Sequence, residues 1–153
     1  MGYLFLKISC YNIFMAKMNP VVHFEMPAKD KKRVSDFYSK AFGWQMNQFG
    51  PEMGNYLLAN TTETDENRMP LKPGAINGGF FDYQDKDGFN VPHLVIAVDN
   101  IEESMKKVEE AGGKILGGMS GPDKIDEIPG VGRYVSFDDS EGNHLGMLQP
   151  FTK

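Results

Sequence analysis

Three histidines and one glutamate are the side chains of this chain best suited to chemistry. His23 and Glu25 lie two residues apart in PVVHFEMP, an apolar run that predicts a β-strand. Side chains two apart on a strand point to the same face, so this imidazole and this carboxylate should lie together. His93 begins a second strand-like run, PHLVIAV, and His144 lies near the start of another. Such groups serve either as metal ligands or in proton transfer.

Each of these side chains has a candidate role and a structural alternative. We predict Glu25 as the general base, because a partly apolar cavity raises the pKa of a carboxyl group. Alternatively, it pairs with a cationic side chain or lies in water at an open edge. His23 and His93 are predicted to bind a metal ion or to polarise a substrate oxygen, the alternative being hydrogen bonds within the cavity. His144 is a candidate substrate-binding residue, or else a solvated residue at a strand end.

Four aromatic residues on or beside predicted strands are candidates for a wall that contacts a ligand. Aromatic side chains on the strands of a small domain also commonly pack in its core, which is the structural alternative. The four residues are Trp44, Tyr56, Phe80 and Tyr134.

The first half of the chain must position His23 and Glu25. After their strand over 20–27, Asp30 is placed to cap a helix, and Gly43 is placed to end it. Apolar residues follow a helical period between these two points. Three further strands are predicted over 44–49, 55–60 and 74–82.

The second half repeats the pattern of the first. A strand over 92–98 carries His93, Asn100 is placed to cap a second helix, and Gly112 and Gly113 end it. Three further strands are predicted over 114–118, 132–138 and 143–149, with an irregular loop rich in Gly and Pro before the second of them.

The repeat of strand, helix and three strands predicts an α+β fold made of two βαβββ modules. The modules cover about 20–82 and 92–150 and form one domain over 18–150. Residues 1–17 are expected to be a leader or tail outside the fold. They lack a basic start, a long apolar run and a small-residue cleavage site, so we expect a cytoplasmic protein.

Composition narrows the classes of partner. The chain has 153 residues, 41% of them hydrophobic, which is typical of one globular domain. Its formal net charge is −5, with scattered cationic residues, so nucleic acid and anionic membrane surfaces are not expected partners. A single cysteine, Cys10, excludes an intramolecular disulfide and a thiolate zinc cluster.

Three segments resemble a known superfamily: VVHFEMPAKDKKRVSDFYSKAFGW, HLVIAVDNIEESMKKVEEAGGKI and IPGVGRYVSFDDSEGNHLGMLQP. They are similar to the vicinal oxygen chelate superfamily, which includes glyoxalase I, extradiol dioxygenases and bleomycin-resistance proteins, and most of all to uncharacterised lactoylglutathione lyase-related proteins. The resemblance implies two βαβββ modules whose curved mixed sheets surround a central cavity, and chains that pair as homodimers.

The resemblance also implies the positions of a divalent metal site. In metal-dependent members one ligand comes from each of four strands, and the corresponding positions here are His23, Gly78, His93 and Gly146. Both histidines are present and both carboxylates are replaced by glycine. A divalent metal ion would therefore find only two of the four usual ligands, and we expect it to bind weakly if it binds. True glyoxalase I activity is not expected.

Two functions remain open at this point, beside a third possibility, a cavity protein with no retained activity. The first is a glyoxalase-related enzyme of lyase, isomerase or dioxygenase type that acts on a small molecule in the cavity. The second is a metal-free protein that binds and sequesters a small molecule, as bleomycin-resistance proteins do. The missing carboxylates favour binding, whereas the paired histidines and Glu25 favour chemistry.

Overall fold

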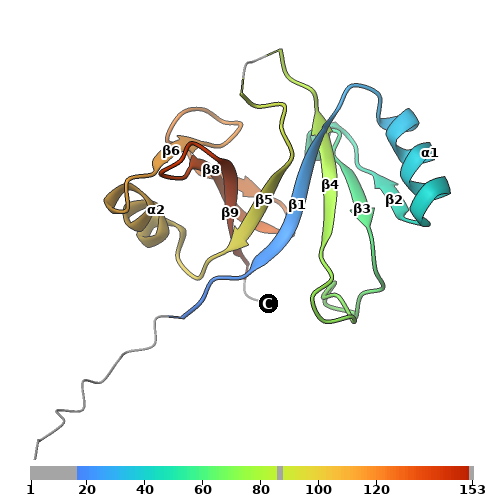
Figure 1. Cartoon of the computed structure of the whole chain (residues 1–153), viewed down its shortest axis with the longest axis horizontal. Helices are drawn as coiled ribbons and strands as arrows, with labels where there is room; N and C mark the ends of the chain where they lie inside the picture. The colour runs from blue at the N-terminus through green and yellow to red at the C-terminus, as the bar shows by residue number, and fades with distance from the viewer. Residues whose placement is uncertain (1–16, 86–87, 152–153) are drawn as a thin grey trace, which may run out of the picture.

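The computed structural model describes residues 17–85 and 88–151, and the predicted leader lies outside this part except for Lys17. The described chain forms one mixed sheet of nine strands with two α-helices, which confirms the predicted α+β fold (Figure 1). The first module consists of β1 (Val21–Ala28), α1 (Lys31–Phe42), β2 (Gln45–Gln48), a short 3-10 helix (Pro51–Met53), β3 (Leu57–Asn60) and β4 (Asn77–Asp82).

The second module repeats this order with one extra strand. It consists of β5 (His93–Ala97), α2 (Ile101–Glu110), β6 (Lys114–Gly117), β7 (Asp126–Ile128), β8 (Gly132–Asp138) and β9 (His144–Pro150). Strand β7 lies inside the segment that we predicted as an irregular loop, and it pairs with β8 alone.

The two modules meet at the centre of the sheet, where β1 and β5 are antiparallel. Each of these strands is parallel on its other side to the last strand of its own module, β4 or β9. The strand order is β2-β3-β4-β1-β5-β9-β8-β6, so the sheet is open and does not close into a barrel. Among the described residues, no helix is long and apolar enough to span a membrane.

Both helices begin at the predicted capping residues. The Asp30 side chain accepts a hydrogen bond from the Arg33 amide at 2.9 Å, and the Asn100 side chain accepts one from the Glu103 amide at 3.0 Å. Helix α1 ends at Gly43, whose φ of 70° lies in the left-handed region that favours glycine.

The strand register defines two faces of the sheet. Phe24 is opposite Leu94, and on the next strand pair Ile96 is opposite Met147. These side chains belong to the face that both helices cover, which we call the outer face. Glu25 belongs to the other, helix-free side, which we call the inner face.

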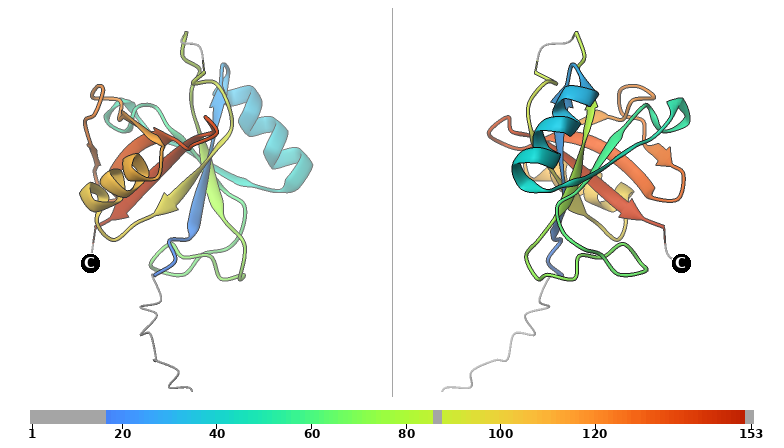
Figure 2. Two further views of the ribbon diagram at one scale, coloured as in Figure 1. Left: turned by 60° about the vertical axis from the view of Figure 1, so that its left-hand side comes forward. Right: turned by 90° about the vertical axis from the view of Figure 1, so that its right-hand side faces the viewer.

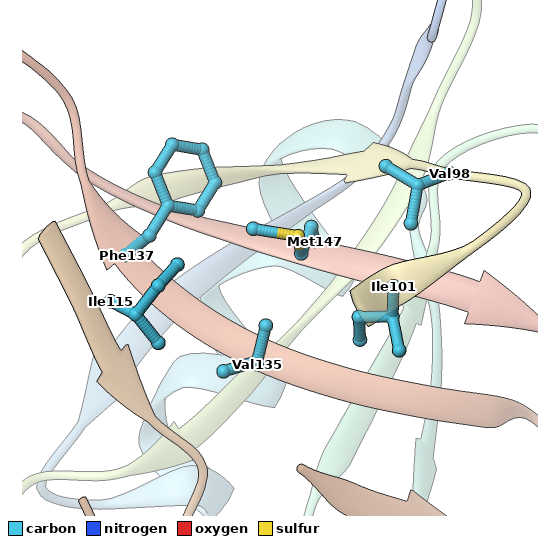
Figure 3. Close-up of a cluster of buried hydrophobic side chains, with 6 residues drawn as sticks. All are labelled: Val98, Ile101, Ile115, Val135, Phe137 and Met147. Carbon is cyan, nitrogen blue, oxygen red and sulfur yellow. The ribbon is translucent and has the colours of Figure 1, made fainter. Parts of the chain in front are cut away.

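Each helix packs its own core against the outer face (Figure 2). Under α1 the buried residues are Ala28, Leu57, Ala59 and Phe80, with Val34 and Tyr38 of the helix packed against them. Under α2 they are Val98, Ile101, Ile115, Val135, Phe137 and Met147 (Figure 3). Because both cores lie on one side of the sheet, the polar side chains of the central strands face the other.

Candidate functional site

The centre of the candidate site is a hydrogen-bonded carboxylate and imidazole, one from each of the two central strands. Glu25 of β1 and His93 of β5 are direct partners in the antiparallel register. His93 Nε2 lies 2.7 Å from Glu25 Oε2, and the two side chains are 5% and 18% exposed. The pair is therefore largely shielded from water, which strengthens its electrostatic interaction.

The second ring nitrogen of His93 also faces an acceptor. Its Nδ1 lies 3.3 Å from the carbonyl oxygen of Val91, which has no proton to donate. With the carboxylate at Nε2, both nitrogens are placed to donate hydrogen bonds. The ring is thus held at both nitrogens, which fixes its orientation beside Glu25.

Two tyrosine hydroxyls complete the cluster. Tyr134 of β8 donates a hydrogen bond to Glu25 Oε2 at 3.0 Å, and Ser136 donates to the Tyr134 hydroxyl at 3.4 Å. The hydroxyl of Tyr56, directly before β3, lies 2.9 Å from Nε2 of His23. His23 and Glu25 thus share the inner face, as their spacing predicted, and each contacts a tyrosine.

Two glycines leave the space that these tyrosine rings occupy. A methyl group on Gly146 would lie 2.5 Å from the Tyr134 hydroxyl, and one on Gly79 would collide with the ring of Tyr56. Gly79 is opposite Glu25, whereas Gly78 is opposite Phe24 and belongs to the outer face. The inner-face glycine of β4 is therefore Gly79, one residue beyond the Gly78 that we aligned with the superfamily's glutamate.

The surroundings of Glu25 lower its pKa, contrary to the raised value that we predicted. Burial by itself raises the pKa of this carboxyl group. The hydrogen bond and electrostatic interaction with His93, and the hydrogen bond from Tyr134, act against burial and outweigh it. Glu25 is therefore an ionised carboxylate at neutral pH, able to accept a proton.

Both tyrosines remain neutral donors. Burial, followed by the charge of Glu25, raises the pKa of Tyr56 and of Tyr134 well above the ordinary value of a phenol. Their hydroxyl protons are retained at neutral and mildly alkaline pH.

Alkaline titration should reveal these two tyrosines. A tyrosine with a raised pKa in the folded state stabilises the fold below about pH 10, and this stabilisation is lost as the pH rises further. We expect the tyrosinate absorbance of the folded Tyr134→Phe variant to match that of the unchanged protein at about pH 10. In denaturant the variant should show one tyrosine fewer; a deficit of one in the folded state would contradict the prediction.

His144 closes the cluster on the far side of His93. The two rings meet edge to face with their centroids 4.9 Å apart, and Asp138 Oδ1 lies 3.3 Å from His144 Nδ1. Burial lowers the pKa of His144, which favours its neutral form. His144 is thus placed beside the candidate base instead of standing in solvent.

The donor set does not fit the metal centre that the resemblance implies. Two histidines and a glutamate have the composition of a common iron site. Here, however, Nε2 of His23 contacts Tyr56, and Nε2 of His93 contacts Glu25. Within 17–85 and 88–151, no three His, Cys, Asp or Glu side chains are placed to hold one ion.

The structure corrects the predicted aromatic wall. Tyr56 and Tyr134 belong to the cluster, but Phe80 is 1% exposed in the core under α1. Trp44 packs against the same core and stacks on Tyr38 with ring centroids 4.5 Å apart. Both therefore lie on the outer face, away from Glu25. An apolar groove of about 360 Å³ lies on this face, lined by Phe24, Met26, Tyr38, Trp44, Pro92, His93 and Leu94.

Three members of the cluster were missed in the sequence: Gly79, Ser136 and Asp138. Ser136 lies two residues after Tyr134 on β8, so strand alternation alone would have placed it on the same face. Asp138 directly follows the buried Phe137 and carries no signal that distinguishes it from a turn residue.

Comparison with solved structures shows the same fold at low sequence identity. A hypothetical protein from Bacillus halodurans matches with a TM-score of 0.61 and 15% identity over 90% of this chain and 98% of its own. Methylmalonyl-CoA epimerase from Mycobacterium tuberculosis matches with a TM-score of 0.59 and 12% identity, over 86% of this chain and 88% of its own. A variant of the Streptomyces coelicolor epimerase, in complex with 2-nitronate-propionyl-CoA, gives 0.62 and 13% identity, over 89% and 100%.

A search of curated proteins gave no match. The family profile described as the Glyoxalase/Bleomycin resistance protein/Dioxygenase superfamily matches residues 21–146, which span both modules and every strand of the polar cluster. The repeated βαβββ order and the sheet topology agree with this match. The chain therefore belongs to the glyoxalase, bleomycin resistance and dioxygenase superfamily.

Proposed function

We propose that this protein is an enzyme that removes a proton from a carbon next to a carbonyl group of a small molecule, with Glu25 as the base. The observation that carries this proposal is the ionised Glu25 carboxylate on the inner face, held by His93 and Tyr134. Proton abstraction of this kind requires at least a carboxylate that is held in place, partly buried and close to hydrogen-bond donors.

The step uses only groups of the described chain. A Glu25 oxygen takes the proton, and the C–H electron pair forms a carbon–carbon double bond while the carbonyl electron pair moves to oxygen. Delivery of a proton to the opposite face of the same carbon gives epimerisation, and delivery to a neighbouring carbon gives isomerisation. Loss of a leaving group from the enolate gives lyase chemistry instead.

His93 keeps Glu25 ready for this step. Its Nε2–H faces the carboxylate oxygen, so the carboxylate keeps its charge between turnovers. His93 is therefore placed to orient the base, and we assign it no metal.

The structural neighbours support a substrate of this class. Several are methylmalonyl-CoA epimerases, and one of these was solved in complex with methylmalonyl-CoA. At 12% to 17% identity they share only the fold with this chain. An acyl thioester nevertheless belongs among the first compounds to test, beside 2-oxo acids and hemithioacetals.

Proton exchange in heavy water tests the proposal without knowledge of the natural substrate. We expect the purified protein to catalyse exchange of the hydrogen next to the carbonyl group in at least one compound of this panel, measured by NMR. Compounds that bind without exchange would favour the sequestration of a small molecule. A panel that neither binds nor exchanges would contradict both functions.

We also propose that the chain forms a homodimer. Two aromatic side chains of α1, Phe37 and Phe42, are 57% and 63% exposed and border the apolar groove on the outer face through Tyr38 and Trp44. A second copy of this chain that covers them would remove this apolar surface from water. Light scattering should give twice the mass of one chain, and a monomer would contradict the proposal.

A further inference from the structure

We infer that the hydroxyls of Tyr56 and Tyr134 form a two-donor site for the oxygen of an enolate, at two places where the last strand of each module carries a glycine on the inner face. This inference rests on the proposed proton abstraction and specifies how its intermediate is stabilised. It also specifies the substrate as a ketone, aldehyde or thioester whose carbonyl oxygen reaches both hydroxyls.

The two halves of the donor site are equivalent in the two modules. Gly79 lies in β4 and Gly146 in β9, the last strands of their modules. Tyr56 directly precedes β3, and Tyr134 lies in β8, the neighbouring strands. In each module a tyrosine ring thus covers a glycine from the adjacent strand, and a side chain on that glycine would displace the hydroxyl.

Each hydroxyl stands between Glu25 and another polar group. Ser136 donates to Tyr134, which donates to Glu25. On the other side His23 contacts Tyr56, whose hydroxyl interacts with Glu25 in turn. Because burial lowers the pKa of His23, its ring is neutral, and its Nε2–H tautomer can donate to Tyr56 and leave that hydroxyl free to donate.

The movement of charge during proton abstraction explains why the donors belong beside the base. Before the step, the negative charge is on Glu25; the Tyr134 hydroxyl donates to it, and the Tyr56 hydroxyl interacts with it. When a Glu25 oxygen has formed its O–H bond and the substrate C–H bond has broken, the charge is on the substrate oxygen. Rotation of each phenolic O–H then follows the charge over a short distance, in a site already arranged for it.

The donors are neutral, and this limits the substrate group that they recognise. None of the described lysine and arginine side chains is among the groups that set the pKa of Glu25. The Glu25 carboxylate, which no described lysine or arginine side chain offsets, would repel a substrate carboxylate or phosphate placed against it. A neutral carbonyl oxygen, which becomes negative only during the reaction, matches this site.

A phenol of known absorbance serves as the probe, because its phenolate resembles an enolate in placing negative charge on one oxygen. We choose 4-nitrophenol and the Glu25→Gln variant, whose neutral amide resembles the base after it has taken the proton. We expect this variant to bind the probe as the phenolate, with the pKa of the probe lowered. Adding Tyr56→Phe or Tyr134→Phe should weaken phenolate binding about tenfold or more, as expected for a hydrogen bond to a charged group.

Matched variants separate the donor role from a structural one. Tyr83→Phe, added to Glu25→Gln, removes an exposed hydroxyl outside the cluster and should leave phenolate binding unchanged. Gly146→Ala keeps both tyrosines but pushes the Tyr134 hydroxyl aside, so it should weaken binding as Tyr134→Phe does. Circular dichroism establishes that each variant is folded before binding is compared.

Three results would overturn the inference: no binding of the probe, equal binding in all tyrosine variants, or binding that disappears when a chelator removes divalent metals. Each is distinguishable from failure of the proposed function. If exchange depends on Glu25 but probe binding is the same in all tyrosine variants, Glu25 remains the proposed base and the two-donor site is contradicted. If probe binding depends on the tyrosines but no compound exchanges, the two-donor site is kept as an anion-binding site and the proposed enzymatic function is contradicted.

Discussion

Replacement of Glu25 by glutamine should lower the rate of proton exchange about 10²- to 10⁴-fold, the usual contribution of a positioned acid or base. The amide keeps the size of the side chain and can still contact His93 and Tyr134, but it accepts no proton at neutral pH. The exchange rate of the best compound in the panel, measured by NMR in heavy water, tests this prediction. Binding of that compound should be retained, because only the proton-accepting group is lost.

A matched control for this change lies on β7. Glu127 is exposed and outside the polar cluster, so Glu127→Gln removes the same charge from the protein and should leave the exchange rate unchanged. An equal loss of rate in both variants would show that net charge, and not the base, controls exchange. A Glu25→Gln variant with full activity would place the base elsewhere.

The strand period allowed part of this site to be predicted. Two-residue alternation correctly placed His23 and Glu25 on one face, and the repeat of the βαβββ order brought the second strand-borne histidine beside them. The helix caps at Asp30 and Asn100 could also be predicted from the sequence, because each cap depends on residues within one helical turn. Each of these features depends on residues or patterns that lie close together in the sequence.

The direction of the pKa shift of Glu25 could not be predicted from the sequence in this way. Its partners His93 and Tyr134 lie 68 and 109 residues away in the chain, and their hydrogen bonds reverse the effect that burial alone would have. The same reason applies to the choice between Gly78 and Gly79 as the glycine that faces the base. A shift of one residue in the register of β4 exchanges the two faces, and only pairing with β1 determines which glycine faces the base.

Aromatic residues posed a different difficulty, since both faces of β4 and its neighbours carry rings. Phe80 lies in β4 and Tyr56 directly precedes β3, yet one is buried under α1 and the other covers Gly79. Neither residue type distinguishes a core position from a binding position, because an aromatic ring supplies apolar area to either. Stability and ligand binding, measured on the same variant, separate the two roles.

Replacement of Phe80 by alanine should therefore destabilise the fold without touching the site. The ring is 1% exposed and lies 5.3 Å from that of Tyr38, so its loss opens a cavity under α1. A change of this kind costs about 3–5 kcal/mol in free energy of unfolding, measured by denaturant titration. Phe80→Leu, which keeps much of the volume, should cost clearly less.

The outcome at the site decides between the two interpretations of Phe80. Because its side chain is on the outer face, the folded fraction of Phe80→Leu should exchange substrate protons as the unchanged protein does. Combined with Glu25→Gln, it should bind 4-nitrophenol as Glu25→Gln alone does. If Phe80→Leu weakened ligand binding and left stability unchanged, Phe80 would contact the ligand as first predicted. Strand β4 would then have to present its other face to the base. Since Gly79 and Phe80 are adjacent in this strand, that result would also remove the ring of Tyr56 from the position on which the two-donor site depends.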